Sequence, residues 1–139
     1  MIDPEKAERL NPLTLAFVGD SVQTLYVRTR LAARSDVKSG ALHVSAAAII
    51  NASAQARAAE ELLPQLQGAE ADIYRRARNA RTAHKAKNAD IADYHKASGL
   101  EAVIGYLYLT GNEERLEYIL NAAFAGGKKE DACHKSNLT

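Results

Sequence analysis

Cysteine, tryptophan and proline are scarce in this sequence, whose 139 residues include one Cys, no Trp and three Pro. The single cysteine, Cys133, excludes an internal disulfide and a cysteine metal site, which suits a reducing cytoplasm. No apolar run approaches the roughly 18 residues that a membrane span needs. The polar start from Met1 to Arg9 is not a secretory signal. We therefore expect a cytoplasmic protein with no membrane segment.

An excess of charge of one sign is also absent, because 18 Lys and Arg residues stand against 17 Asp and Glu residues. Only local clustering could then indicate a nucleic-acid partner. Hydrophobic residues make up 47% of the chain and charged residues 25%, and no alternating Val/Thr-rich run is present. This balance predicts one all-α globular domain over residues 1–126. A polar, disordered tail is expected over residues 127–139.

Apolar periodicity places the expected helices. A helix from Pro12 to about Ala33, capped by Asn11, is apolar around much of its circumference, so it should be central or buried in a partner subunit. Further helices are expected near residues 41–44, 47–63, 69–79, 93–109 and 113–125, with a loop over 80–89. The expected core stripe of the helix over 93–109 is Leu100, Val103, Ile104 and Leu107. That of the helix over 113–125 is Leu116, Ile119, Leu120 and Ala123.

Asp20 lies inside the first of these apolar helices, where an ionised carboxylate is costly to bury without a basic partner or a cation. Gly19 beside it is also unusual, because a mid-helix glycine costs about 1 kcal/mol relative to Ala. The glycine is explained if another group must approach the backbone closely. The plain alternative is that Asp20 sits on the solvated edge of its helix.

Glu101 shares a helical ridge with Ala97, Gly105 and Tyr108. Small residues around it would allow another helix to pack close and bring Glu101 beside Asp20. Two such carboxylates suit Mg²⁺, which prefers oxygen ligands and keeps several waters, and which can activate water for phosphodiester hydrolysis. The alternative is a surface Glu next to a core stripe.

A basic run from Tyr74 to Asn88 contains six Lys and Arg residues and no acid. Cations at a helix end and in the adjoining loop can contact successive phosphates. The alternative is a solvated helix face whose cations favour the helix C-terminus. The RNA-binding candidates in this run are Arg76, Arg78, Asn79, Arg81, Lys85 and Lys87.

The sequence resembles the ribonuclease III catalytic domain. The segment from Phe17 to Val22 is similar to the core of that family's signature helix, and the segment from Leu100 to Leu109 is similar to its second acidic helix. The Mini-ribonuclease III branch matches more closely, in order along nearly the whole chain. The matching segments are 10–16, 54–56, 76–80, 87–90 and 94–109.

The resemblance implies an all-α endonuclease fold of about six to seven helices and an obligate homodimer joined through the signature helix. It implies an endoribonuclease for double-stranded RNA, acting on precursor large-subunit (23S-type) ribosomal RNA, with a ribosomal protein as a candidate accessory. By position, Asp20 and Glu101 would be the catalytic metal ligands, with Mg²⁺ as cofactor and Mn²⁺ as a substitute. The basic run would replace a separate RNA-binding domain, reading A-form RNA by shape and phosphates.

The chain departs from the larger enzymes of the family at two positions. Ala16 and Ser98 stand where those enzymes carry acids, so metal affinity should depend more on RNA phosphate and water. One alternative is therefore a catalytically degenerate RNA-binding module of the same fold. Another is a helical interaction scaffold, which leaves Gly19, Asp20 and the basic run unexplained.

Overall fold

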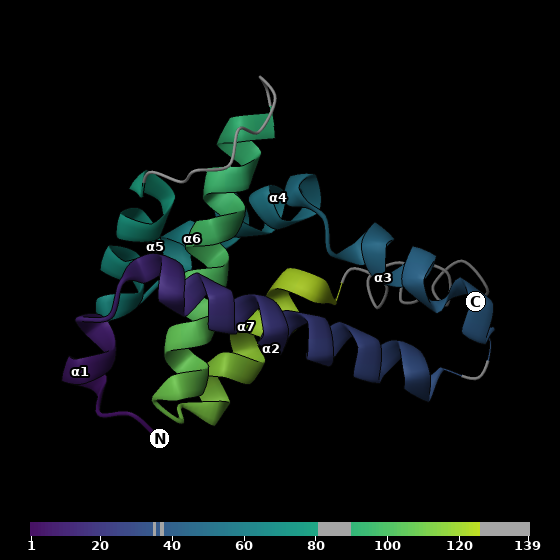
Figure 1. The fold of residues 1–139 in the computed structure, drawn as a ribbon, viewed down its shortest axis with the longest axis horizontal. Coiled ribbons are helices and arrows are strands. Elements are labelled where there is room, and N and C mark those ends of the chain that lie inside the picture. Colours follow the sequence, from purple (N-terminus) through teal and green to yellow (C-terminus); the bar gives the residue numbers. More distant parts are fainter. Residues whose placement is uncertain (35, 37, 81–89, 126–139) are drawn as a thin grey trace, which may run out of the picture.

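The computed structural model describes residues 1–34, 36, 38–80 and 90–125, and over these residues the chain is helical with no strand (Figure 1). None of the helices in these ranges is long and apolar enough to cross a membrane. The elements in chain order are α1 (Pro4–Glu8), α2 (Pro12–Ala33), η1 (Ser39–Ala41), α3 (Leu42–Ile49), α4 (Ala52–Leu62), η2 (Leu63–Gln65), α5 (Ala69–Asn79), α6 (Asp90–Leu109) and α7 (Glu113–Phe124). The all-α fold expected from the sequence is confirmed.

Helix α6 is the centre of the fold. Its largest contact is with α2, and α4 and α5 pack along its upper half on opposite sides (Figure 1). Helix α7 packs against α4 and α6, whereas the last turn of α2 and α3 extend away from the body as an arm. The expected α6 stripe, Leu100, Val103, Ile104 and Leu107, is fully buried. This stripe forms the core together with Leu15, Ile73 and Ile119.

Helix α2 has the bounds that the sequence predicted. Asn11 caps it by accepting a hydrogen bond from the Leu13 backbone N–H at 2.9 Å, and Pro12 occupies the first turn. At its far end α2 is tied to α7, because the Tyr26 hydroxyl hydrogen-bonds Asn121 and the Arg30 guanidinium donates to the Tyr26 oxygen at 2.7 Å. These contacts fix the direction of α2 across the face of α6.

The helix break expected between residues 44 and 47 was placed wrongly. Helix α3 continues to Ile49, and the break falls at Ile50 and Asn51. Asn51 is the N-cap of α4, since its side chain accepts a hydrogen bond from the Ala54 N–H at 2.9 Å. Residues 46–48 are alanines, which favour helix, and the capping asparagine decides where the next helix begins.

The other helices differ less from the positions that the sequence predicted. Helix α6 begins at Asp90, three residues before the expected start, and the short helix α1 was not anticipated. Gly111, in the left-handed region with φ of 72°, closes the turn between α6 and α7. Residues 81–89 and 126–139, which hold the expected loop and tail, lie outside the described residues.

Candidate active site at the crossing of helices α2 and α6

Two glycines allow the backbones of α2 and α6 to touch. A Cβ atom at Gly19 would overlap the carbonyl oxygen of Glu101, and a Cβ atom at Gly105 would overlap the carbonyl oxygen of Leu15. Both glycines are buried in regular helix. The close approach expected at Gly19 is therefore present, and the element that approaches is α6.

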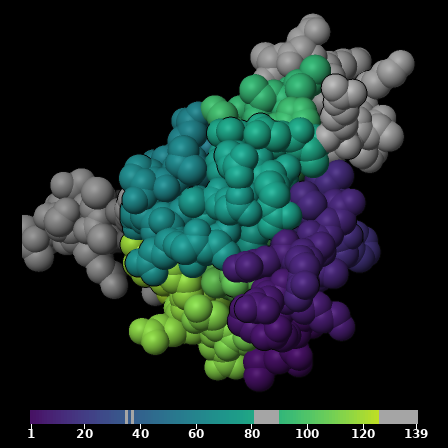
Figure 2. Space-filling model, turned by 90° about the vertical axis from the view of Figure 1, so that its left-hand side faces the viewer, coloured from purple at the N-terminus to yellow at the C-terminus, as the bar shows by residue number. Residues whose placement is uncertain are grey.

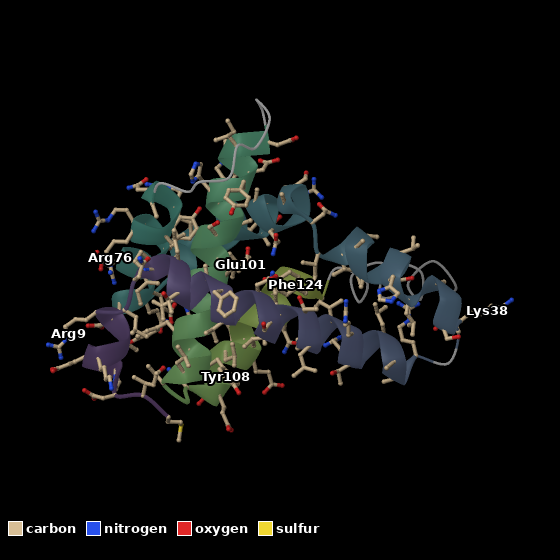
Figure 3. The ribbon with its side chains drawn as sticks, viewed as in Figure 1. Arg9, Lys38, Arg76, Glu101, Tyr108 and Phe124 are labelled. Carbon is tan, nitrogen blue, oxygen red and sulfur yellow. The ribbon has the colours of Figure 1, made fainter. Side chains whose placement is uncertain are left out.

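The same crossing brings the Asp20 and Glu101 side chains together. Asp20 is exposed on the edge of α2, whereas Glu101 is half-buried in the angle between the helices (Figure 3). The two carboxyl groups are close enough for the charge of Asp20 to act on Glu101. Asp20 is exposed on the edge of its helix, as the plain alternative held. That alternative did not include Glu101 as a neighbour of Asp20.

Glu101 has an unusual proton affinity. Burial raises the pKa of its carboxyl group, and the neighbouring Asp20 charge and the hydrogen bond to Asp20 raise it further, to about 8. Without a cation, the raised pKa favours the protonated form of the Glu101 carboxyl group near neutral pH. A bound cation would instead favour the ionised form of both carboxyl groups, because it attracts both negative charges.

The donor set fits a hard divalent cation that keeps most of its own water. Asp20 and Glu101 supply only carboxylate oxygens, which are the ligands that Mg²⁺ prefers. Within the described ranges, no group of three or more His, Cys, Asp or Glu side chains could hold a metal ion. A cation bound here would therefore have water or phosphate oxygen as its remaining ligands.

A buried amide borders this pair and was missed in the sequence. The Gln23 side chain is fully buried, and its Nε2 lies 3.5 Å from Asp20 Oδ1. The signal that could have found it is its spacing. Gln23 follows Gly19 by four residues and Asp20 by three, so it shares their side of the helix.

The described basic candidates, Arg76 and Arg78, lie on α5, which borders α1 and the start of α2 (Figure 2). Arg76 is held within the chain, because its Nε donates to Asp72 at 2.9 Å and its Nη2 donates to the Glu8 carbonyl at 2.8 Å. Arg78 lies over the Tyr74 ring at 5.7 Å, and its Nε is 3.3 Å from the Asn79 side-chain oxygen.

Arg76 therefore lies apart from the acidic pair. Arg76 lies to one side of the molecule and Glu101 lies at the helix crossing (Figure 3). The other three basic candidates, Arg81, Lys85 and Lys87, fall outside the described residues. Asn79 ends α5 and leads into that segment.

Comparison with known proteins places the chain in a family. Residues 13–112, which run from the start of α2 to the turn after α6, match the ribonuclease III domain. The chain is 47% identical to a Mini-ribonuclease 3 of Brevibacillus brevis, over 83% of this chain and 86% of that protein. It is 46% identical to a Mini-ribonuclease 3 of Staphylococcus aureus, over 81% and 85% of the two chains.

A crystal structure of a Fusobacterium nucleatum protein shares the fold with a TM-score of 0.75 and 28% identity, covering 86% of this chain and 95% of that one. The family resemblance expected from the signature helix and the second acidic helix is confirmed by these matches. The chain belongs to the ribonuclease III family, in its Mini-ribonuclease 3 branch, and is an endoribonuclease.

Proposed function

We propose that this endoribonuclease cleaves double-stranded RNA with a Mg²⁺ ion held by Asp20 and Glu101, and that Mn²⁺ can replace Mg²⁺. Ribonuclease III enzymes generally depend on a divalent metal. The observation that carries the proposal is the close crossing of α2 and α6 at Gly19, which brings the carboxyl groups of Asp20 and Glu101 near each other. When bound, the ion would polarise a water molecule and neutralise charge on the scissile phosphate.

The chain itself supplies the rigid frame for this chemistry. Glu101 must release its proton before it can ligate a cation, and Asp20 is exposed, so an RNA phosphate could reach its carboxylate. Gly19 and Gly105 fix the spacing of the two helices, so the carboxylates keep their positions without a flexible loop. With Ala16 and Ser98 in place of the acids of larger enzymes, phosphate oxygens would complete the coordination.

The proposed RNA contacts are Arg78, Asn79, Arg81, Lys85 and Lys87, with Arg76 beside them. Arg78 is the better placed of the two described arginines, because Arg76 already binds Asp72 and the Glu8 carbonyl. Contacts of this kind go to phosphates and give binding with weak sequence selectivity and strong salt dependence.

A homodimer is part of the proposal. Three large apolar side chains are exposed on the α2 side of the molecule: Phe17 at 77%, Leu25 at 68% and Tyr108 at 55%. Tyr108 lies on the lower half of α6, on the face that α2 crosses (Figure 3). A second copy of this chain would cover these side chains and place two acidic pairs on one RNA duplex, one for each strand.

The natural substrate in this proposal is precursor 23S-type ribosomal RNA in the cytoplasm, with a ribosomal protein as the candidate accessory. These assignments follow from the Mini-ribonuclease 3 branch. They are tested by whether deletion of the gene leaves unprocessed large-subunit RNA ends, and whether the purified protein trims them alone or only with a ribosomal protein added.

The cleavage experiment uses a plain RNA duplex, with Mg²⁺ in one arm and EDTA in the other. Asp20→Asn should keep the fold and RNA binding but lose cleavage by at least about a hundredfold, because a carboxylate ligand becomes a neutral amide. Asp90→Asn, at the exposed start of α6, is the matched control and should cleave normally. An active Asp20→Asn protein would contradict the metal-ligand assignment. Binding without cleavage by the wild type would favour the degenerate RNA-binding module.

A further inference from the structure

Gln23 is a polar residue in a position that packing alone does not explain. Its side chain is 0% exposed, one turn beyond Asp20 on the inner side of α2. Its amide nitrogen makes one long hydrogen bond, at 3.5 Å, to Asp20 Oδ1. Its amide oxygen is buried and has no hydrogen-bond partner among the described residues. A buried acceptor without a partner costs about 1 to 3 kcal/mol.

The described residues contain one other buried side-chain polar atom without a hydrogen-bond partner, His95 Nδ1. The buried carboxylate of Glu70 shows the more usual arrangement. Glu70, at 5% exposed, is fully engaged, because it accepts hydrogen bonds from the Arg115 guanidinium at 2.9 Å and from the Gln67 N–H at 3.1 Å. Gln23 has no such partner in the core, and its one polar contact points out of the core to the exposed carboxylate of the acidic pair. An apolar side chain of the same length would fill the space without the cost.

We propose that Gln23 is a positioning residue of the cation site. Its amide N–H holds the Asp20 carboxylate in the direction needed to ligate the cation, and its free Oε1 offers an acceptor to water on the buried side of the site. The inference rests on the proposed cation site at Asp20 and Glu101. Hydrogen bonds from outer residues orient the ligands of metal sites, and their loss typically lowers metal affinity 10- to 100-fold.

The test compares Mn²⁺ binding by the wild type, Gln23→Met and Gln23→Leu, measured by titration calorimetry without RNA. Both variants fill the space with apolar atoms and remove the donor to Asp20. We expect the Mn²⁺ dissociation constant to rise roughly tenfold, while resistance to urea stays equal or increases. The Mn²⁺ concentration for half-maximal RNA cleavage should rise in parallel, and saturating Mn²⁺ should restore the rate.

Val27→Ala is the matched control. Val27 lies one turn further along α2, is 2% exposed and is not hydrogen-bonded to Asp20 through its side chain. It should lose stability and keep the wild-type Mn²⁺ affinity. Unchanged Mn²⁺ affinity in both Gln23 variants would overturn the role of Gln23 and leave the cation site standing. Failure of the wild type to bind Mn²⁺, or equal binding by Asp20→Asn, would instead overturn the cation site itself.

Discussion

The carbonyl oxygen of Glu101 lies where a side chain at Gly19 would have to begin, so α2 and α6 meet backbone to backbone beside the acidic pair. No side chain lies between the two backbones at this point, so none could move aside to make room for a larger residue at Gly19. The position of the Glu101 carboxyl group relative to Asp20 is therefore set by the glycine and by the direction in which α2 crosses α6 (Figure 1).

Gly19→Ala should destabilise the protein and reduce cleavage. Alanine favours helix by about 1 kcal/mol, but its Cβ would overlap the Glu101 backbone, and overpacking of this kind typically costs about 1 to 3 kcal/mol or more. Urea unfolding and a duplex cleavage assay measure both effects. Gly40→Ala is the control, because a Cβ there meets nothing within 4 Å. Equal behaviour of the two variants would contradict the close crossing.

The stability of the metal-free protein should fall as pH rises from about 4.5 to 8. The folded-state pKa of Glu101 is raised from 4.5 to about 8, so the folded state binds an extra proton in this window and loses that advantage as the proton leaves. The change amounts to a few kcal/mol at most, since one pKa unit corresponds to about 1.4 kcal/mol.

Urea unfolding in EDTA at pH 6 and pH 8.5 measures this, and Glu101→Gln provides the comparison because glutamine cannot ionise. The difference in stability between the wild type and Glu101→Gln should shift in favour of the variant at the higher pH. Added Mg²⁺ should remove part of that shift, since cation binding favours the deprotonated carboxylate. Parallel pH profiles for the two proteins would show that Glu101 ionises normally.

The ion pair between Glu70 and Arg115 should matter more for stability than the other ion pairs. The Glu70 and Arg115 side chains are 6% and 15% exposed, and Arg115 also donates to the Gln65 carbonyl at 2.6 Å. Glu70→Ala leaves a largely buried guanidinium unpaired, which typically costs about 3 to 5 kcal/mol. Arg75→Ala, which removes an exposed partner of Asp72, should cost under about 1 kcal/mol. Thermal unfolding ranks the two variants.

The dimer is tested with Phe17→Glu and Leu25→Glu. Each places a charge on the exposed apolar side of α2, so we expect a monomer by light scattering coupled to size exclusion, together with weaker cleavage. Leu63→Glu changes an exposed apolar residue on η2 and should leave the oligomeric state unchanged. A wild-type monomer at micromolar concentration, fully active, would contradict the dimer proposal.

The sequence predicted those features that depend on local patterns. The start of α2 follows from Asn11 and Pro12, and the buried stripe of α6 follows from four apolar residues at helical spacing. It misplaced the break before α4, because a run of alanines carries no signal for where a helix ends and the capping role of Asn51 was overlooked.

The candidate site was predictable in part. The pairing of Gly19 with Asp20 indicated a close approach and a carboxylate beside it, but the depth of Glu101 and the orphaned oxygen of Gln23 depend on how α2 crosses α6. Arg76 shows the same limit. Its place in a basic run indicated a phosphate contact, whereas its bond to the Glu8 carbonyl joins segments 68 positions apart.

The most direct test of the cation site is anomalous diffraction from crystals of the wild-type protein soaked in Mn²⁺. We predict a peak between the carboxyl groups of Asp20 and Glu101, within ligand distance of both, and its disappearance in crystals of Asp20→Asn. A cleavage-active crystal form whose Mn²⁺ peak lies elsewhere, or which shows no peak at saturating Mn²⁺, would contradict the account.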